Sequence, residues 1–91
     1  PSDASTVDLT DMTVLPGLID SHVHLDSDAG GDAGLLEELQ KSDGWFAINA
    51  YANGLKTLRA GFTTVRNLGD GTGATLALRD AVKAGIVQGP R

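Results

Sequence analysis

Cysteine is absent from this chain of 91 residues. Without it there is no disulfide framework and no zinc site built on thiolates, and the absence fits a reducing compartment. Long apolar runs are also missing, because no stretch approaches the roughly 18 residues that a transmembrane helix requires. No signal peptide is recognisable either. From these absences we expect a cytoplasmic protein that has no membrane partner.

Positive charge is scarce. Seven Lys and Arg residues against 12 Asp and Glu residues give a formal net charge of -5 and a pI of about 4.6. Nucleic acids and anionic membranes are bound by clusters of Lys and Arg, so we expect neither as a partner. The composition is otherwise that of a globular protein, with 41% hydrophobic and 21% charged residues. A chain of this length can bury only a small core.

The most informative stretch is residues 14–26, V-L-P-G-L-I-D-S-H-V-H-L-D. Pro16 cannot sit inside a central strand, so a new strand is expected to begin near Leu18. Side chains alternate along a strand, which places His22 and His24 on one face with their Cα atoms roughly 6.5–7 Å apart. That spacing allows two imidazole nitrogens to bind one metal ion. The stretch therefore predicts a pair of histidine metal ligands at the end of an apolar strand.

Two acidic residues flank the histidine pair. Asp20 and Asp26 have the same parity as the histidines, and they share the same face if the strand stays regular. The alternative interpretation is two histidines on a half-exposed strand that hold nothing. The apolar run, the Pro-Gly break and Asp20 favour the interpretation that the two histidines bind a metal ion.

The rest of the chain alternates between patterns that are typical of strands and of helices. We predict short strands at 7–9 and 12–15, a strand at 62–68, helices at 35–42, 45–60 and 74–84, and a further apolar element from 86. Strands that alternate with helices indicate an α/β fold with parallel strands and right-handed crossovers. The Gly-rich loops 27–34 and 69–73 then leave the strand ends where sites of α/β folds assemble.

Each longer helix has a predicted buried face. The apolar stripe of helix 45–60 is expected to contain Ile48, Tyr51, Ala52, Leu55 and either Leu58 or Arg59. Asn49 and Asn53 then fall mostly on the other side, and Gly54 allows close packing against a strand. The stripe of helix 74–84 is expected to contain Ala74, Leu78, Ala81 and Val82. Thr72 is the predicted N-cap of this helix, while Gly61 and Gly85 are predicted C-terminal caps.

Three blocks of the chain, in order, resemble the amidohydrolase superfamily of metal-dependent hydrolases. L-P-G-L-I-D-S-H-V-H (15–24) resembles the first barrel strand of that family, and R-A-G-F-T-T-V-R-N (59–67) resembles the second. L-R-D-A-V-K-A-G-I-V-Q-G-P-R (78–91) resembles the stretch that leads to the third. The pattern is most similar to imidazolonepropionase-like enzymes and to Xaa-Pro or Xaa-Arg dipeptidases. The chain departs from it at Asn67, where relatives often have Asp.

The resemblance implies a fold as well as a family. Residues 16–91 would be the first two βα units of a (β/α)8 (TIM) barrel, and residues 1–15 the end of a flanking β-sandwich or a linker. The chain is then expected to be an N-terminal fragment of a longer protein. Its expected partners are the remainder of its own chain and further copies of the same protein in a homo-oligomer.

The resemblance also implies a function. His22 and His24 would bind one or two divalent metals, usually Zn²⁺, with Asp20 beside the site. Further ligands and the catalytic acid/base come from later strands, so no catalytic residue is assigned here. Three lysines on predicted helices are not assigned as a bridging ligand: Lys41, Lys56 and Lys83. The implied reaction is hydrolysis of a C–N bond in a small-molecule or dipeptide-like substrate by a metal-activated water. The 91-residue piece alone is expected to be inactive.

Two other functions compete with this one. The first is a non-catalytic barrel fragment that serves as a structural or assembly piece through its open sheet edge. The second is a small phosphate-binding module built on the loop at 69–73, although that loop lacks the G-x-x-x-x-G-K-[ST] order. We rank the phosphate-binding function last.

Overall fold

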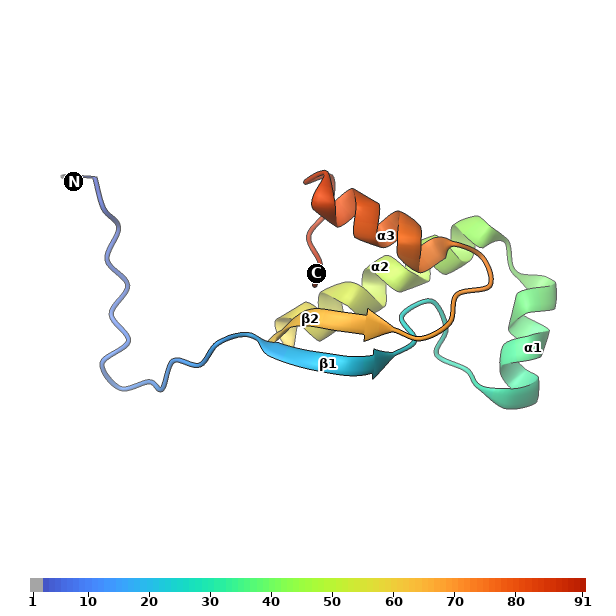
Figure 1. Ribbon diagram of the computed structural model, residues 1–91, viewed down its shortest axis with the longest axis horizontal. Helices are drawn as coiled ribbons and strands as arrows, with labels where there is room; N and C mark the ends of the chain where they lie inside the picture. Colours follow the sequence, from blue (N-terminus) through green and yellow to red (C-terminus); the bar gives the residue numbers. More distant parts are fainter. Residues whose placement is uncertain (1–2) are drawn as a thin grey trace.

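The computed structural model describes residues 3–91 and folds them into two strands and three helices. Their order is β1 (Leu18–Val23), α1 (Gly31–Gln40), α2 (Asp43–Arg59), β2 (Phe62–Asn67) and α3 (Ala74–Lys83). The two strands pair in parallel, with Leu18 opposite Phe62 and Asp20 opposite Val65. The predicted α/β class is therefore confirmed. In Figure 1, α2 and α3 lie on the same side of the strand pair, whereas α1 stands at the far end.

Local signals explain where the helices begin and end. The Ser42 hydroxyl accepts a hydrogen bond from the Trp45 amide at 3.3 Å and so caps α2. After α3, the amide of Gly85 donates to the Val82 carbonyl and the amide of Ile86 donates to the Ala81 carbonyl. This pair of bonds requires the left-handed φ of +72° that glycine adopts without strain at position 85. The predicted glycine caps, at 85 and at Gly61 with its φ of +97°, are confirmed.

The core lies between α2, α3 and the residues that follow β1. Its buried members are apolar residues of these three segments: Leu25, Phe46, Ala50, Ala74 and Leu78. The predicted stripe of α3 is confirmed, because Ala74 and Leu78 are buried and Val82 packs against the core. Trp45 meets Phe46 edge to face, with ring centroids 5.1 Å apart, an arrangement that packed aromatic side chains prefer.

The predicted stripe of α2 is wrong. Ile48 is 72% exposed, and the buried face instead carries Phe46, Ala50, Asn53 and Gly54. Small residues on this face let α3 approach closely, because a Cβ added at Gly54 would lie only 3.2 Å from Leu78 Cδ2. Gly54 thus packs against a helix and not against a strand. Packing with a neighbour, rather than hydrophobicity alone, decided which face turned inward.

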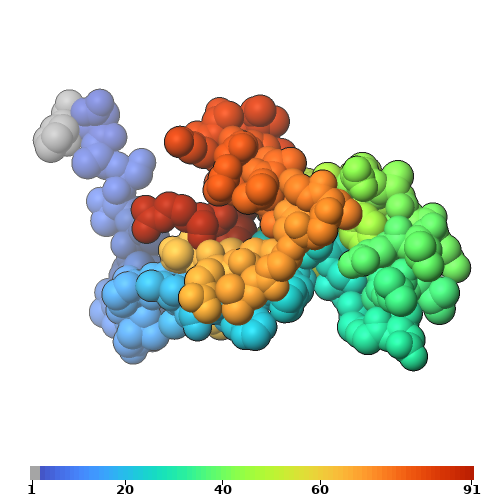
Figure 2. Space-filling view, turned by 45° about the vertical axis from the view of Figure 1, so that its right-hand side comes forward, coloured from blue at the N-terminus to red at the C-terminus, as the bar shows by residue number. Residues whose placement is uncertain are grey.

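The strands predicted at 7–9 and 12–15 are also wrong. Described residues before β1 form no strand, and Val7 and Met12 are 75% and 70% exposed. A strand needs a neighbouring backbone to accept and donate its hydrogen bonds, and no described segment lies beside this one. The segment instead projects away from the rest of the chain, as the blue parts of Figures 1 and 2 show.

Two further boundaries differ from expectation. Helix α1 covers 31–40 instead of 35–42, and Asp32 in its first turn is a residue that favours a helix start. The apolar residues at 86–87 are not a strand, because Ile86 is used in the cap of α3. Strand-like pairing begins later, where Arg91 donates to the Thr63 carbonyl and accepts from the Val65 amide, both at 2.8 Å. Within residues 3–91 no helix has the length and apolarity to cross a membrane.

Candidate metal site

The two histidines lie together at the carboxyl end of β1. His22 is in the strand and His24 directly follows its last residue, Val23. Both side chains are exposed, and their ring centroids are 5.4 Å apart with the planes tilted by 60°. Two imidazoles that bind one tetrahedral ion at about 2.0–2.1 Å would hold their ring centroids about 5 Å apart. The arrangement of the pair therefore fits a shared metal ion.

Asp20 contacts the backbone of the pair. Its Oδ1 accepts a hydrogen bond from the His22 amide at 3.0 Å, so the carboxylate orders the chain at His22. The register with β2 is irregular between Asp20 and Val23, so the strand does not keep the strict alternation that would align Asp26 with the histidines. Within residues 3–91 no three His, Cys, Asp or Glu side chains are grouped to hold a metal ion. Among the described residues the histidine pair is therefore not joined by a third side chain of these types.

Three asparagines, Asn49, Asn53 and Asn67, hold the backbone that follows His24. The Leu25 amide donates to Asn67 Oδ1 at 2.9 Å, and the Leu25 carbonyl accepts from Asn53 Nδ2 at 3.0 Å. Asn49 Nδ2 donates to the Asp26 carbonyl at 2.9 Å. We call these three residues the asparagine clamp.

Sequence reasoning missed the asparagine clamp, and it placed Asn53 on the wrong side of its helix. Asn53 is buried, and its Nδ2 also donates to Asp28 Oδ1 at 3.0 Å. One signal was available, because Asn49 and Asn53 are four residues apart and so lie on one face of α2. An amide pair on the helix that follows a predicted site loop is a reason to expect contacts with that loop.

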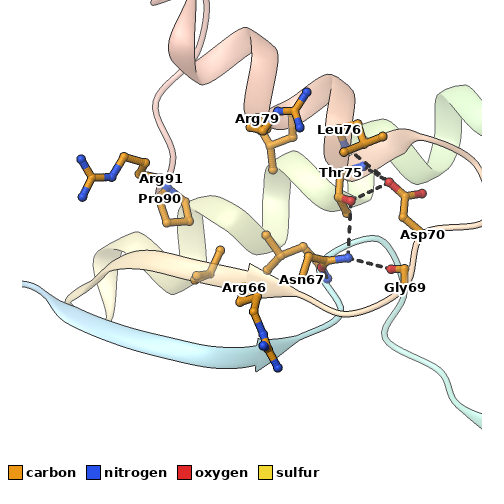
Figure 3. Close-up of a pocket in the computed structure, with 12 residues that line it drawn as sticks. Arg66, Asn67, Gly69, Asp70, Thr75, Leu76, Arg79, Pro90 and Arg91 are labelled. Atoms are coloured by element: carbon orange, nitrogen blue, oxygen red, sulfur yellow. Dashed lines mark hydrogen bonds between the residues drawn. The ribbon is translucent and has the colours of Figure 1, made fainter.

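Asp70 organises the loop that follows β2. Its carboxylate accepts hydrogen bonds from four consecutive backbone amides, at 3.1 Å or less: Thr72, Gly73, Ala74 and Thr75. Partial burial raises the pKa of this carboxyl, but the hydrogen bonds, led by those from Thr75, outweigh that effect and lower the pKa from 3.8 to about 2. Figure 3 shows Asp70 beside Thr75 at the start of α3.

Asp70 changes two predictions about this loop. The N-cap position of α3 is Gly73 and not Thr72, and the side chain that serves the first amides of the helix is that of Asp70. The Thr72 hydroxyl accepts only one longer bond, from the Ala74 amide at 3.3 Å. The amides that a phosphate would need already donate to the Asp70 carboxylate, so the loop at 69–73 is not a free anion cradle. The phosphate-binding alternative therefore loses its site.

A cavity opens where the loop after β1, helix α1 and the loop after β2 meet. It has a volume of about 510 Å³, and His24 lies in its wall with four carboxylates: Asp26, Asp28, Glu38 and Asp70. The cavity is therefore negatively charged, and one member of the histidine pair faces it.

The three lysines that were not assigned as a bridging ligand lie in helices or directly after one, as expected: Lys41, Lys56 and Lys83. Lys56 Nζ donates to Asn53 Oδ1 at 2.9 Å.

These features define a parallel α/β protein with an imidazole pair at the carboxyl edge of its sheet. The chain belongs to the amidohydrolase family, because the sequence model of that family matches residues 13–91. The match includes both histidines and the whole of the described sheet.

A solved structure is similar to this chain over most of its length. It is a Xaa-Pro dipeptidase with methionine bound in the active site, 37% identical in sequence, with a TM-score of 0.72. The similarity covers 84% of this chain and 18% of the dipeptidase chain. The comparison with curated proteins finds no match. The predicted resemblance to amidohydrolases of the dipeptidase-like subgroup is confirmed.

Proposed function

We propose that this chain forms the first βα units of the (β/α)8 barrel of a metal-dependent hydrolase. The observation that carries the proposal is the 5.4 Å separation of the His22 and His24 rings at the carboxyl end of β1. In barrel enzymes the active site forms at this end of the strands. The pairing of Arg91 with β2 supports a third strand at the edge of β2 that β1 leaves free. Residues 1–15 would link the barrel to a flanking domain.

His22 and His24 would each present one ring nitrogen to a divalent metal, with zinc as the expected ion because imidazole is among its usual ligands. A bound divalent metal supplies Lewis acidity, which polarises a carbonyl group and makes a nearby water more acidic. Asp20 keeps the His22 backbone in place through its hydrogen bond to the His22 amide. The remaining ligands and the acid/base group would come from other strands of the same barrel.

The proposed reaction is hydrolysis of a C–N bond in a small, dipeptide-like substrate. The cavity beside His24 has a volume of about 510 Å³, which lies within the range of about 300–1,000 Å³ typical of small-molecule sites. The similarity to a Xaa-Pro dipeptidase supports a peptide-like substrate. Because His24 lies in the cavity wall, a substrate bound in the cavity would lie next to the histidine pair.

The test is the metal content of the intact protein. We expect purified protein to contain bound zinc and to hydrolyse dipeptides, and His22→Ala and His24→Ala variants to lose most of both. Lys83→Ala, at the exposed end of α3, is the matched surface control and should behave as wild type. Metal content that stays the same in both histidine variants would contradict the proposal.

A further inference from the structure

Asn67 ends β2 and joins three separate groups through one amide. Its Oδ1 accepts from the Leu25 amide at 2.9 Å, and its Nδ2 donates to the Gly69 carbonyl at 2.7 Å. A longer bond of 3.4 Å joins Nδ2 to the Thr75 hydroxyl. Figure 3 shows Asn67 between the end of β2 and the start of α3, with dashed lines to Gly69 and Thr75. The side chain therefore fixes the ends of both βα loops relative to each other.

His24 lies between the two main attachment points of that amide. Leu25 is its neighbour in the chain, and Gly69 lies beside its ring. A Cβ added at Gly69 would be 3.8 Å from His24 Cε1 and 3.9 Å from His24 Nδ1. Gly69 has a φ of +109°, a conformation that favours glycine and presents a bare backbone to the ring. Asn67 thus holds both the backbone that leaves His24 and the loop against which the imidazole rests.

In the described part of the chain, the His24 ring has no hydrogen bond of its own that would hold it independently of this loop. Within residues 3–91 the imidazole makes no hydrogen bond to another side chain or to the backbone. The Leu25 carbonyl is held by buried Asn53, and the Leu25 side chain is only 6% exposed. The amide, carbonyl and side chain of Leu25 are thus all held by contacts. The Asn67 side chain connects Leu25 to Gly69, because it bonds to both.

We propose that Asn67 is a positioning residue that orients the His24 imidazole for metal binding, an inference that rests on the function proposed above. In this chain the role uses both ends of an amide, because one atom accepts from the Leu25 amide while the other donates to the Gly69 carbonyl. A carboxylate at this position keeps the first bond but sets an oxygen against the Gly69 carbonyl. Asn67→Asp and Asn67→Ala therefore both release the loop that supports the ring.

The experiment compares Asn67→Ala and Asn67→Asp with a control that weakens packing elsewhere. Val82→Ala is that control, because Val82 packs against the core from the last turn of α3. Co²⁺ binding to the intact protein, followed by visible absorption, should be weakened about 10–100-fold in both Asn67 variants. In Val82→Ala it should stay within about twofold of wild type, as expected for an independent site. Equal affinities in wild type and both Asn67 variants would overturn the proposal.

A second readout does not depend on metal. In the wild-type protein, a nuclear Overhauser effect between the His24 Hε1 and Gly69 Hα protons should report the ring resting on the loop. The effect should disappear in Asn67→Ala and persist in Val82→Ala, and its persistence in Asn67→Ala would refute the positioning role. If wild type binds no Co²⁺ through its histidines, the proposed function fails, while this proton contact still decides whether Asn67 orients His24.

Discussion

The loops after β1 and β2 leave the same edge of the sheet but are held in different ways. After β1, Leu25 is fixed by the amides of Asn53 and Asn67, which are 28 and 42 residues away in sequence. After β2, the Asp70 carboxylate accepts hydrogen bonds from backbone amides only two to six residues further on. The backbone of the first loop at Leu25 depends on distant residues, whereas the second loop is held by residues close to it in sequence, Asp70 and, through the Gly69 carbonyl, Asn67.

This difference matters for the proposed site because His24 belongs to the loop that depends on the fold. Any change that loosens α2 or β2 is expected to move the backbone after His24. A local carboxylate such as that of Asp70 resists such changes, since its donors lie in the same loop and in the first turn of α3. Three substitutions test the comparison, and they are considered from the largest expected effect to the smallest.

Leu25→Ala should cause the largest loss of stability. Leu25 is 6% exposed and packs in the core with Phe46 and Ala50, so removing its side chain leaves a cavity. We expect the free energy of unfolding, measured by urea denaturation, to fall by about 2–5 kcal/mol. Leu76→Ala is the matched control after the second loop, because Leu76 is 53% exposed, and it should change stability by no more than about 0.5 kcal/mol. Equal effects would mean that the first loop is not anchored in the core.

Asn53→Asp should have the next largest effect. The substitution keeps the shape of the side chain but replaces the donor that serves the Leu25 carbonyl and Asp28 with an acceptor. We expect urea denaturation to show a loss of about 1–3 kcal/mol, the usual cost of leaving a buried polar group without its partner. Asn49→Asp is the control, because Asn49 is half-buried and serves one carbonyl. A larger loss for Asn49→Asp would reverse the order of importance within the asparagine clamp.

The same contrast between local and distant contacts explains what the sequence could predict. The closeness of the His22 and His24 rings, whose centroids are 5.4 Å apart, was expected from their spacing of two residues, and the cap at Gly85 follows from residues within one turn of it. These two placements depend on neighbours in the chain and were predicted correctly, whereas metal binding by the two histidines stays a prediction. The α/β order of elements was predicted for the same reason.

Features that depend on distant partners were missed. Asn53 looked like a solvent-facing residue because its partners, Leu25 and Asp28, reach it only after the chain has folded. The strands expected at 7–9 and 12–15 failed for the converse reason, since an alternating pattern cannot form a strand without a neighbour to pair with. Asp70 is an intermediate case: its donors are local, but the sequence also offered Thr72 as a cap, and only the geometry distinguishes the two.

The smallest effect is expected at the second loop, and it should depend on pH. Asp70→Asn keeps an oxygen acceptor but removes the charge that faces the backbone amides at the start of α3, so stability at pH 7 should fall by about 1 kcal/mol. The pKa of Asp70 is about 2 in the folded chain against an ordinary value of 3.8, so the folded state binds fewer protons between these values. The stabilisation is therefore complete above about pH 4 and is lost as the pH falls through about 2.

The difference between wild type and Asp70→Asn should consequently narrow when urea denaturation is repeated at decreasing pH. Asp80→Asn is the matched control in the same helix, because Asp80 forms an exposed salt bridge of 2.8 Å with Arg79 that contributes at most about 1 kcal/mol. A gap for Asp70→Asn that stays constant down to about pH 2 would show that charge is not what holds this loop. The second loop would then depend on the neutral hydrogen bonds of its side chain, as the first loop does, and the contrast between the two loops would reduce to the distance of their partners along the chain.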